Sequence, residues 1–175
     1  MKHPHPVPGI GRRQLWLLTL CVFAAVAQDA PLSQYIDKGA CPFECCTYRD
    51  WTALEPITLY DVPNGKTAVG ALKKGEVVKA LTGEVHSIPV RVTATHDIAE
   101  TDIKKGDAFY VLHYEGECYW TLWFKGKVAH AESCSDDAPS PRTTWWVKVQ
   151  TRSGVTGWAV SRDHNFANQD ACGSP

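Results

Sequence analysis

The clearest structural signal in this chain lies near its C-terminus, in the stretch Trp145–Val160, which reads WWVKVQTRSGVTGWAV. Its first six residues alternate: Trp145 shares one side with two valines, and Trp146 shares the other side with Lys148. A period of two residues is typical of a strand with one buried face. Gly154 then interrupts the run and is free to adopt a positive φ. The stretch therefore predicts a β-hairpin on which the other strands pack.

The first 27 residues have the layout of a secretory signal peptide. Three basic residues precede an apolar run at 15–27, which ends in the small-residue cleavage pattern Ala-Val-Ala and is too short to span a membrane. Cleavage after Ala27 removes three of the 18 basic residues and none of the 19 acidic ones, leaving 148 residues with a formal charge of −4. We therefore expect an exported protein, periplasmic or secreted, with no membrane span after signal removal. Its mildly acidic character does not suit nucleic acid.

Six cysteines remain after cleavage, and an even count in an exported chain predicts disulfide bonds. They are Cys41, Cys45, Cys46, Cys118, Cys134 and Cys172. Their spacing suggests that Cys41 closes a small ring with one member of the adjacent pair, while the other member ties this segment to the body of the fold. Cys118 and Cys134 flank a hairpin-like region and are placed to pair across it, and Cys172 would then fix the C-terminal tail. The full connectivity stays open, because six cysteines allow 15 pairings.

Short strands separated by turn residues run through the mature chain and predict an all-β fold. The mature sequence has no extended apolar period of 3.6 residues, which a helix would need. We divide it into a cysteine-rich lead-in loop at 28–56, a β-barrel region at 57–160 and a C-terminal tail at 161–175 that is mostly irregular.

Two pieces of the barrel region resemble the bacterial SH3-like (SH3b) domain. Thr58–Gly65 and Val69–Val78 are similar to its opening strand, RT-type loop and second strand. Trp145–Ala159 is similar to its closing strands, with Trp-x-Lys-Val followed by Gly-x-x-Gly-Trp. The resemblance covers about a third of the mature chain. It implies a small SH3-like barrel and a non-catalytic module that contacts cell-wall peptides or partner proteins.

The middle of the chain departs from this resemblance, because residues 79–144 intervene where the family has a few short strands. Two disulfide-stapled arrangements stay open. In the first, one SH3-like barrel carries an elaborated β insertion at about 79–144. In the second, two SH3-like barrels are fused, which a repeated Lys-Lys-Gly at 73–75 and 104–106 favours weakly.

The candidate ligand-binding residues are mainly aromatic side chains on polar strand faces. Trp146 lies beside Lys148 and Gln150, and Tyr119 and Trp123 share a face with Thr121. The resemblance places a tyrosine and an aspartate in the ligand-facing loop, where the ring would stack and the carboxylate would bind a basic or amine group. The complete set is Tyr60, Asp61, Trp146, Trp158, Tyr119 and Trp123. The alternative is that the rings cover neighbouring strands and that the aspartate only forms the turn before Pro63.

No sequence pattern indicates catalysis, a metal or a cofactor. A Gly-x-Ser-x-Gly elbow, a His-Glu-x-x-His motif and a phosphate loop are all missing from the sequence. The cysteine cluster at 41–46 lacks the second pair of closely spaced ligands that zinc sites use. We therefore expect a binding module that recognises a peptide, peptidoglycan or a partner protein in the cell envelope. The alternative is a structural or assembly protein of the envelope without a small ligand.

Overall fold

The computed structural model describes residues 31, 33–132, 140–162 and 165–172, and within them the chain forms twelve strands and no α-helix. The all-β prediction is confirmed. The expected signal peptide, 1–27, lies outside the described residues. Within the described ranges no helix is long and apolar enough to cross a membrane.

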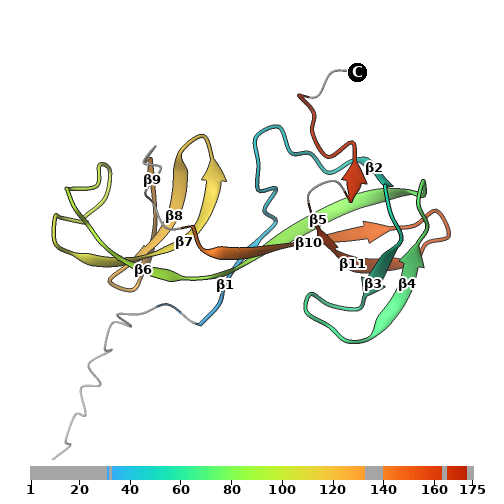
Figure 1. Ribbon diagram of the computed structural model, residues 1–175, viewed down its shortest axis with the longest axis horizontal. Helices are drawn as coiled ribbons and strands as arrows, with labels where there is room; N and C mark the ends of the chain where they lie inside the picture. The colour runs from blue at the N-terminus through green and yellow to red at the C-terminus, as the bar shows by residue number, and fades with distance from the viewer. Residues whose placement is uncertain (1–30, 32, 133–139, 163–164, 173–175) are drawn as a thin grey trace, which may run out of the picture.

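The larger of two sheets curls into a half-barrel (Figure 1). Its strands are β1 (Tyr35–Lys38), β2 (Asp50–Ala53), β3 (Ile57–Tyr60), β4 (Ala68–Leu72), β5 (Val77–Ile88), β10 (Arg142–Gln150), β11 (Thr156–Ser161) and β12 (Phe166–Ala167). They follow the order β12-β2-β5-β10-β11-β3-β4, with β1 paired to β5 as well. The hairpin expected at the C-terminal stretch is β10–β11, which is antiparallel and turns through Gly154 at a φ of 88°.

The core of the larger sheet draws on segments that the sequence analysis assigned to a loop and a tail. The lead-in region, 28–56, contains β1 and β2, so it is more than a loop. Trp51 of β2 is fully buried, and its indole N–H donates to the Thr47 carbonyl at 2.9 Å. Phe166 of β12 pairs with β2 and packs in the same core. These strands have only four and two residues, too few for alternation to show.

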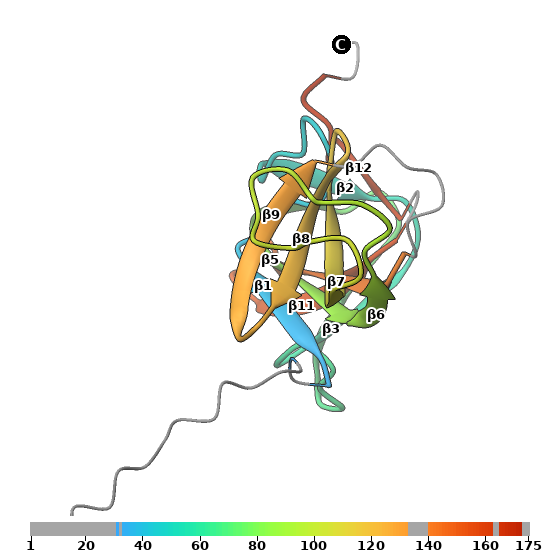
Figure 2. The same ribbon diagram turned by 90° about the vertical axis from the view of Figure 1, so that its left-hand side faces the viewer.

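The smaller sheet is built from the expected insertion and has a core of its own. Its strands are β6 (Val90–Thr93), β7 (Ala108–Gly116), β8 (Tyr119–Phe124) and β9 (Lys127–Glu132). They form a meander in the order β6-β7-β8-β9, and Figure 2 shows β7, β8 and β9 side by side. Its buried residues include Ile103, Phe109, Trp120, Leu122 and Phe124. The meander differs in strand order from the larger sheet, so it does not support the duplication.

Two disulfide bonds join cysteines of the lead-in segment to each other and to the C-terminal segment. Cys41 bonds Cys46, which confirms the small ring, and Cys45 bonds Cys172, which ties the C-terminal segment to it. Cys118 is also disulfide-bonded. Its expected partner, Cys134, lies outside the described residues.

Candidate functional site

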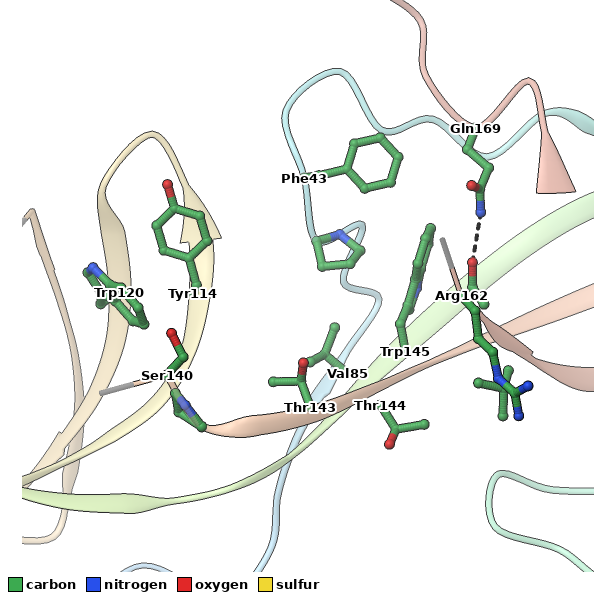
Figure 3. Close-up of a pocket in the computed structure, with 14 residues that line it drawn as sticks. Phe43, Val85, Tyr114, Trp120, Ser140, Thr143, Thr144, Trp145, Arg162 and Gln169 are labelled. Carbon is green, nitrogen blue, oxygen red and sulfur yellow. Dashed lines mark hydrogen bonds between the residues drawn. The ribbon is translucent and has the colours of Figure 1, made fainter. Parts of the chain in front are cut away.

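A cleft of about 810 Å³ lies between the two sheets and is lined by side chains from both (Figure 3). Its smaller-sheet wall is Tyr114 of β7 and Trp120 of β8, whose ring centroids are 4.8 Å apart. Trp120 is buried in the core, whereas Tyr114 is 44% exposed. The Tyr114 hydroxyl accepts a hydrogen bond from the Cys118 backbone at 3.0 Å. The ring of Tyr114 is therefore held in place with one side open to the cleft.

Phe43 forms the facing wall, and its position is set by a disulfide. It lies inside the ring that Cys41 and Cys46 close, and it is 36% exposed. Its ring packs edge-on against Trp145 of β10, with centroids 5.7 Å apart. Trp145 in turn packs edge-on against the core residue Trp51 at 5.6 Å. The wall is thus anchored in the larger sheet, and Figure 3 shows Phe43 across the cleft from Tyr114.

Gly83 of β5 makes this packing feasible. A Cβ atom at this position would lie 2.6 Å from the Trp145 indole nitrogen, 2.9 Å from the Ala40 carbonyl oxygen and within clashing distance of the Tyr48 hydroxyl. The Tyr48 hydroxyl donates to that same carbonyl. Because glycine has no Cβ, β5 can approach these groups closely.

The far end of the cleft is polar. Gln169 donates from Nε2 to the Ser161 hydroxyl at 2.7 Å, as drawn in Figure 3. Arg162 follows β11 directly, and its backbone N–H donates to Asn165 Oδ1 at 3.0 Å. The Asn165 amide donates in turn to the Val160 carbonyl at 2.8 Å. The backbone of this turn is therefore fixed, while the exposed Arg162 side chain forms no ion pair with the described part of the chain.

Three of the six predicted ligand-binding residues lie together on the outer face of the larger sheet. Tyr60 is the register partner of Trp158, and its ring meets Trp146 edge-on at 6.1 Å. Trp146 and Trp158 are only 6% and 9% exposed, so the expectation that Trp146 presents an exposed ring is wrong. The turn after β3 folds over this face, where Asn64 Nδ2 lies 3.1 Å from His86 Nδ1. A ligand role for this face stays a prediction.

The other predicted residues lie elsewhere. Asp61 is exposed, and its carboxylate accepts from the Val62 backbone at 2.9 Å, as the turn-forming alternative expects. Tyr119 and Trp123 lie on β8 of the smaller sheet, on the face opposite its core. Tyr119 is 42% exposed and Trp123 is half-buried. The fold therefore divides the predicted set between two sheets.

A buried polar network on the smaller sheet was missed by sequence reasoning. His113 is 3% exposed, and its Nε2 lies 3.0 Å from Asp37 Oδ2 and 3.3 Å from Thr121 Oγ1. The Thr121 hydroxyl donates to Glu115, which also lies 2.6 Å from His130 Nδ1. Burial raises the pKa of Glu115, but the hydrogen bonds from Thr121 and His130 and the nearby histidine charges outweigh it and lower the pKa. No sequence signal marked the network, because its members come from four strands.

The network and the cysteines offer little for catalysis or metal binding. Thr121 is 1% exposed, so a substrate cannot reach its hydroxyl, and we interpret the network as a structural link between β1 and the smaller sheet. Ligand atoms of Cys45, Asp170 and Cys172 lie within 4.8 Å of one another. The two sulfurs are bonded to each other, however, and a disulfide is not the thiolate that metals bind.

The cleft has the chemistry of a binding site. It offers exposed aromatic rings on two walls and hydrogen-bonding groups at one end, which is typical of ligand recognition. Comparisons with protein-family models, curated proteins and solved structures give no significant match to this chain.

Proposed function

We propose that this chain is an exported, non-catalytic binding protein that holds an extended peptide-like ligand in the cleft between its two sheets. The observation that carries the proposal is the facing pair Phe43 and Tyr114, two exposed aromatic rings anchored on opposite walls. Exposed rings held rigidly gain binding free energy from buried surface at a low cost in side-chain entropy. A cleft of this volume lies in the range of ligand sites. The ligand is a peptide segment of the cell wall or of a partner protein in the envelope.

We also propose that the larger sheet is an SH3-like barrel modified by the insertion. In support, the β3–β4 and β10–β11 hairpins, which carry the family resemblance, lie next to each other in the sheet. Val69 of β4 lies close to Gly157 of β11, and Val155, which precedes β11, lies close to Gly70 of β4. These contacts pack β4 against β11. Export is supported by the disulfide bonds, which persist in oxidising compartments.

Co-sedimentation with purified cell-wall sacculi tests the function. We expect Tyr114→Ala to abolish sedimentation of the mature protein. Tyr119→Ala is the matched control, because it removes the same ring at nearly equal exposure from the same hairpin but outside the cleft. Retained binding by Tyr114→Ala, with loss on Trp146→Ala and an intact fold by circular dichroism, would move the site to the outer face of the larger sheet. Failure of the wild type to sediment would exclude the wall and leave a partner protein.

Assembly in the envelope is the second candidate function, and the edge of β4 favours it. β4 is the last strand of the larger sheet, it carries no charged residue, and Val69 is 40% exposed. Uncharged edge strands promote pairing between chains. Analytical ultracentrifugation tests this candidate: the wild type should associate, and Val69→Lys should be monomeric. A monomeric wild type at high concentration would remove the assembly proposal.

A further inference from the structure

β10 extends beyond its neighbour β11 at one end, so part of the β10 backbone pairs only with β5. Its pairing with β5 begins at Arg142, whereas its pairing with β11 begins only at Trp145. Among the described residues, 142–144 pair with β5 alone. In the part of the chain that the structure describes, no second strand lies beside this edge, and such an edge can pair with another strand.

The cleft runs along this free edge. Consecutive strand residues point to opposite faces of a sheet, so Thr143 and Thr144 point in opposite directions. Both residues nevertheless line the cleft. Val85 and Val160 line it as well, and they also belong to opposite faces of the sheet. A cleft lined by residues of both faces reaches around the edge of the strand. Figure 3 shows Thr143 and Thr144 along β10, between the aromatic wall and the polar end.

We propose that an extended peptide adds to this edge as a short strand, beside 142–144 and in line with β11. The proposal rests on the proposed function and states how the ligand is held. Three residues at about 3.3 Å each give an edge of roughly 10 Å, enough to pair about three peptide residues. In strand addition the main chain supplies affinity, and pockets for alternate side chains supply specificity. Phe43 and Tyr114 line the same cleft and would provide the apolar contacts.

Charge sets the direction of the peptide. Arg162 is the one charged side chain among the described residues that line the cleft, and it lies where pairing between β10 and β11 begins. Ser161 accepts from Gln169, which leaves its own hydroxyl proton to donate. A terminal carboxylate at this point would accept charge-assisted hydrogen bonds from both groups. A peptide whose C-terminus lies at Arg162 runs parallel to β10. Because the group bound there is a terminal carboxylate, the occupant is the free C-terminal end of a protein partner.

Two pools of random hexapeptides, one with free C-terminal carboxylates and one with carboxamides, test the direction on immobilised mature protein. We expect the wild type to retain the free-acid pool about tenfold more strongly, the preference that one charge-assisted hydrogen bond gives. Arg162→Gln should retain both pools equally. Arg152→Gln is the control, because Arg152 is an exposed arginine in the β10–β11 turn and does not line the cleft.

The same experiment separates the inference from the proposed function. Equal retention of both pools by the wild type would overturn the carboxylate direction while leaving peptide binding intact. Retention of neither pool, together with binding to sacculi, would overturn the protein partner but not the cleft. Retained peptides are then resynthesised with N-methyl groups on their last three residues, which removes the backbone donors. Strand addition predicts at least a tenfold loss of retention, and unchanged retention would overturn it.

Discussion

The two sheets each bury an apolar core on one face, but they cover the other face differently. On the larger sheet the rings of Tyr60 and Trp146 pack against each other at 6.1 Å. On the smaller sheet the corresponding face buries His113 and Thr121, linked to the partly buried Glu115. Aromatic packing depends on volume, whereas a buried polar network depends on complete hydrogen bonding and on protonation. The larger sheet should therefore respond most to truncation, and the smaller sheet to loss of hydrogen bonds and to pH.

The largest effect is expected from Trp51→Ala in the larger core. This side chain is fully buried and contacts the rings of Trp145 and Phe166. Its removal should lower the free energy of unfolding by about 3–5 kcal/mol, the usual cost of deleting a buried large aromatic ring. Urea unfolding followed by circular dichroism measures it. A loss below about 1 kcal/mol would show that the lead-in strands are not part of the core.

Next in size is the disulfide between Cys45 and Cys172, which closes a separation of 127 residues. The double variant Cys45→Ser/Cys172→Ser should lose about 2–5 kcal/mol, because long loops gain most entropy when they are opened. Cys41→Ser/Cys46→Ser opens a separation of only five residues and is the matched control. It should cost less stability but weaken ligand binding more, since it frees Phe43. Equal effects of the two variants on binding would contradict the role of the small ring.

Thr121→Val tests the polar network without changing the side-chain volume much. It removes a donor to Glu115 and a partner of His113, and it should cost about 1–3 kcal/mol. The control Thr58→Val alters an exposed threonine on β3 of the larger sheet and should change stability by less than about 0.5 kcal/mol. If both variants cost the same in thermal unfolding, the network contributes nothing specific.

The smallest effect is a dependence of stability on acid pH. The pKa of Glu115 is lower in the folded protein than its ordinary value of 4.5, so its charged form stabilises the fold above that value. The stabilisation should be lost as the pH falls from 4.5 through the folded pKa. Glu115→Gln should flatten this part of the stability curve and leave the neutral-pH slope unchanged. An identical acid limb in wild type and variant would exclude Glu115 as its source.

The β10–β11 hairpin could be predicted from sequence because its alternation is long and Gly154 punctuates it. β2 could not, because four residues carry little pattern and its partners, β5 and β12, are distant in the chain. The small ring could be predicted from the close spacing of the cysteines at 41–46. The bond between Cys45 and Cys172 could not, because only the fold brings these two residues together. Alternation also predicted a polar strand face for Trp146, but the side chain is buried in the fold and Tyr60 of β3 packs edge-on against its ring.

The cleft could not be predicted, because its walls come from segments that only the topology brings together. Phe43, Tyr114 and Trp145 lie in a disulfide loop and in strands of two different sheets. Taken alone, each residue is typical of an aromatic side chain that packs over a neighbouring strand. Their common site depends on how the sheets are placed, and local sequence patterns do not carry that information.

The indole N–H resonances of the tryptophans test the central claim most directly, because Trp120 and Trp145 line the cleft whereas Trp146 and Trp158 lie on the outer face of the larger sheet. We would record two-dimensional ¹⁵N–¹H spectra of the mature protein while adding the retained peptides or solubilised wall fragments. We predict that the signals of Trp120 and Trp145 shift and that those of Trp146 and Trp158 stay in place. Shifts confined to Trp146 and Trp158 would contradict the cleft and place the ligand on the outer face.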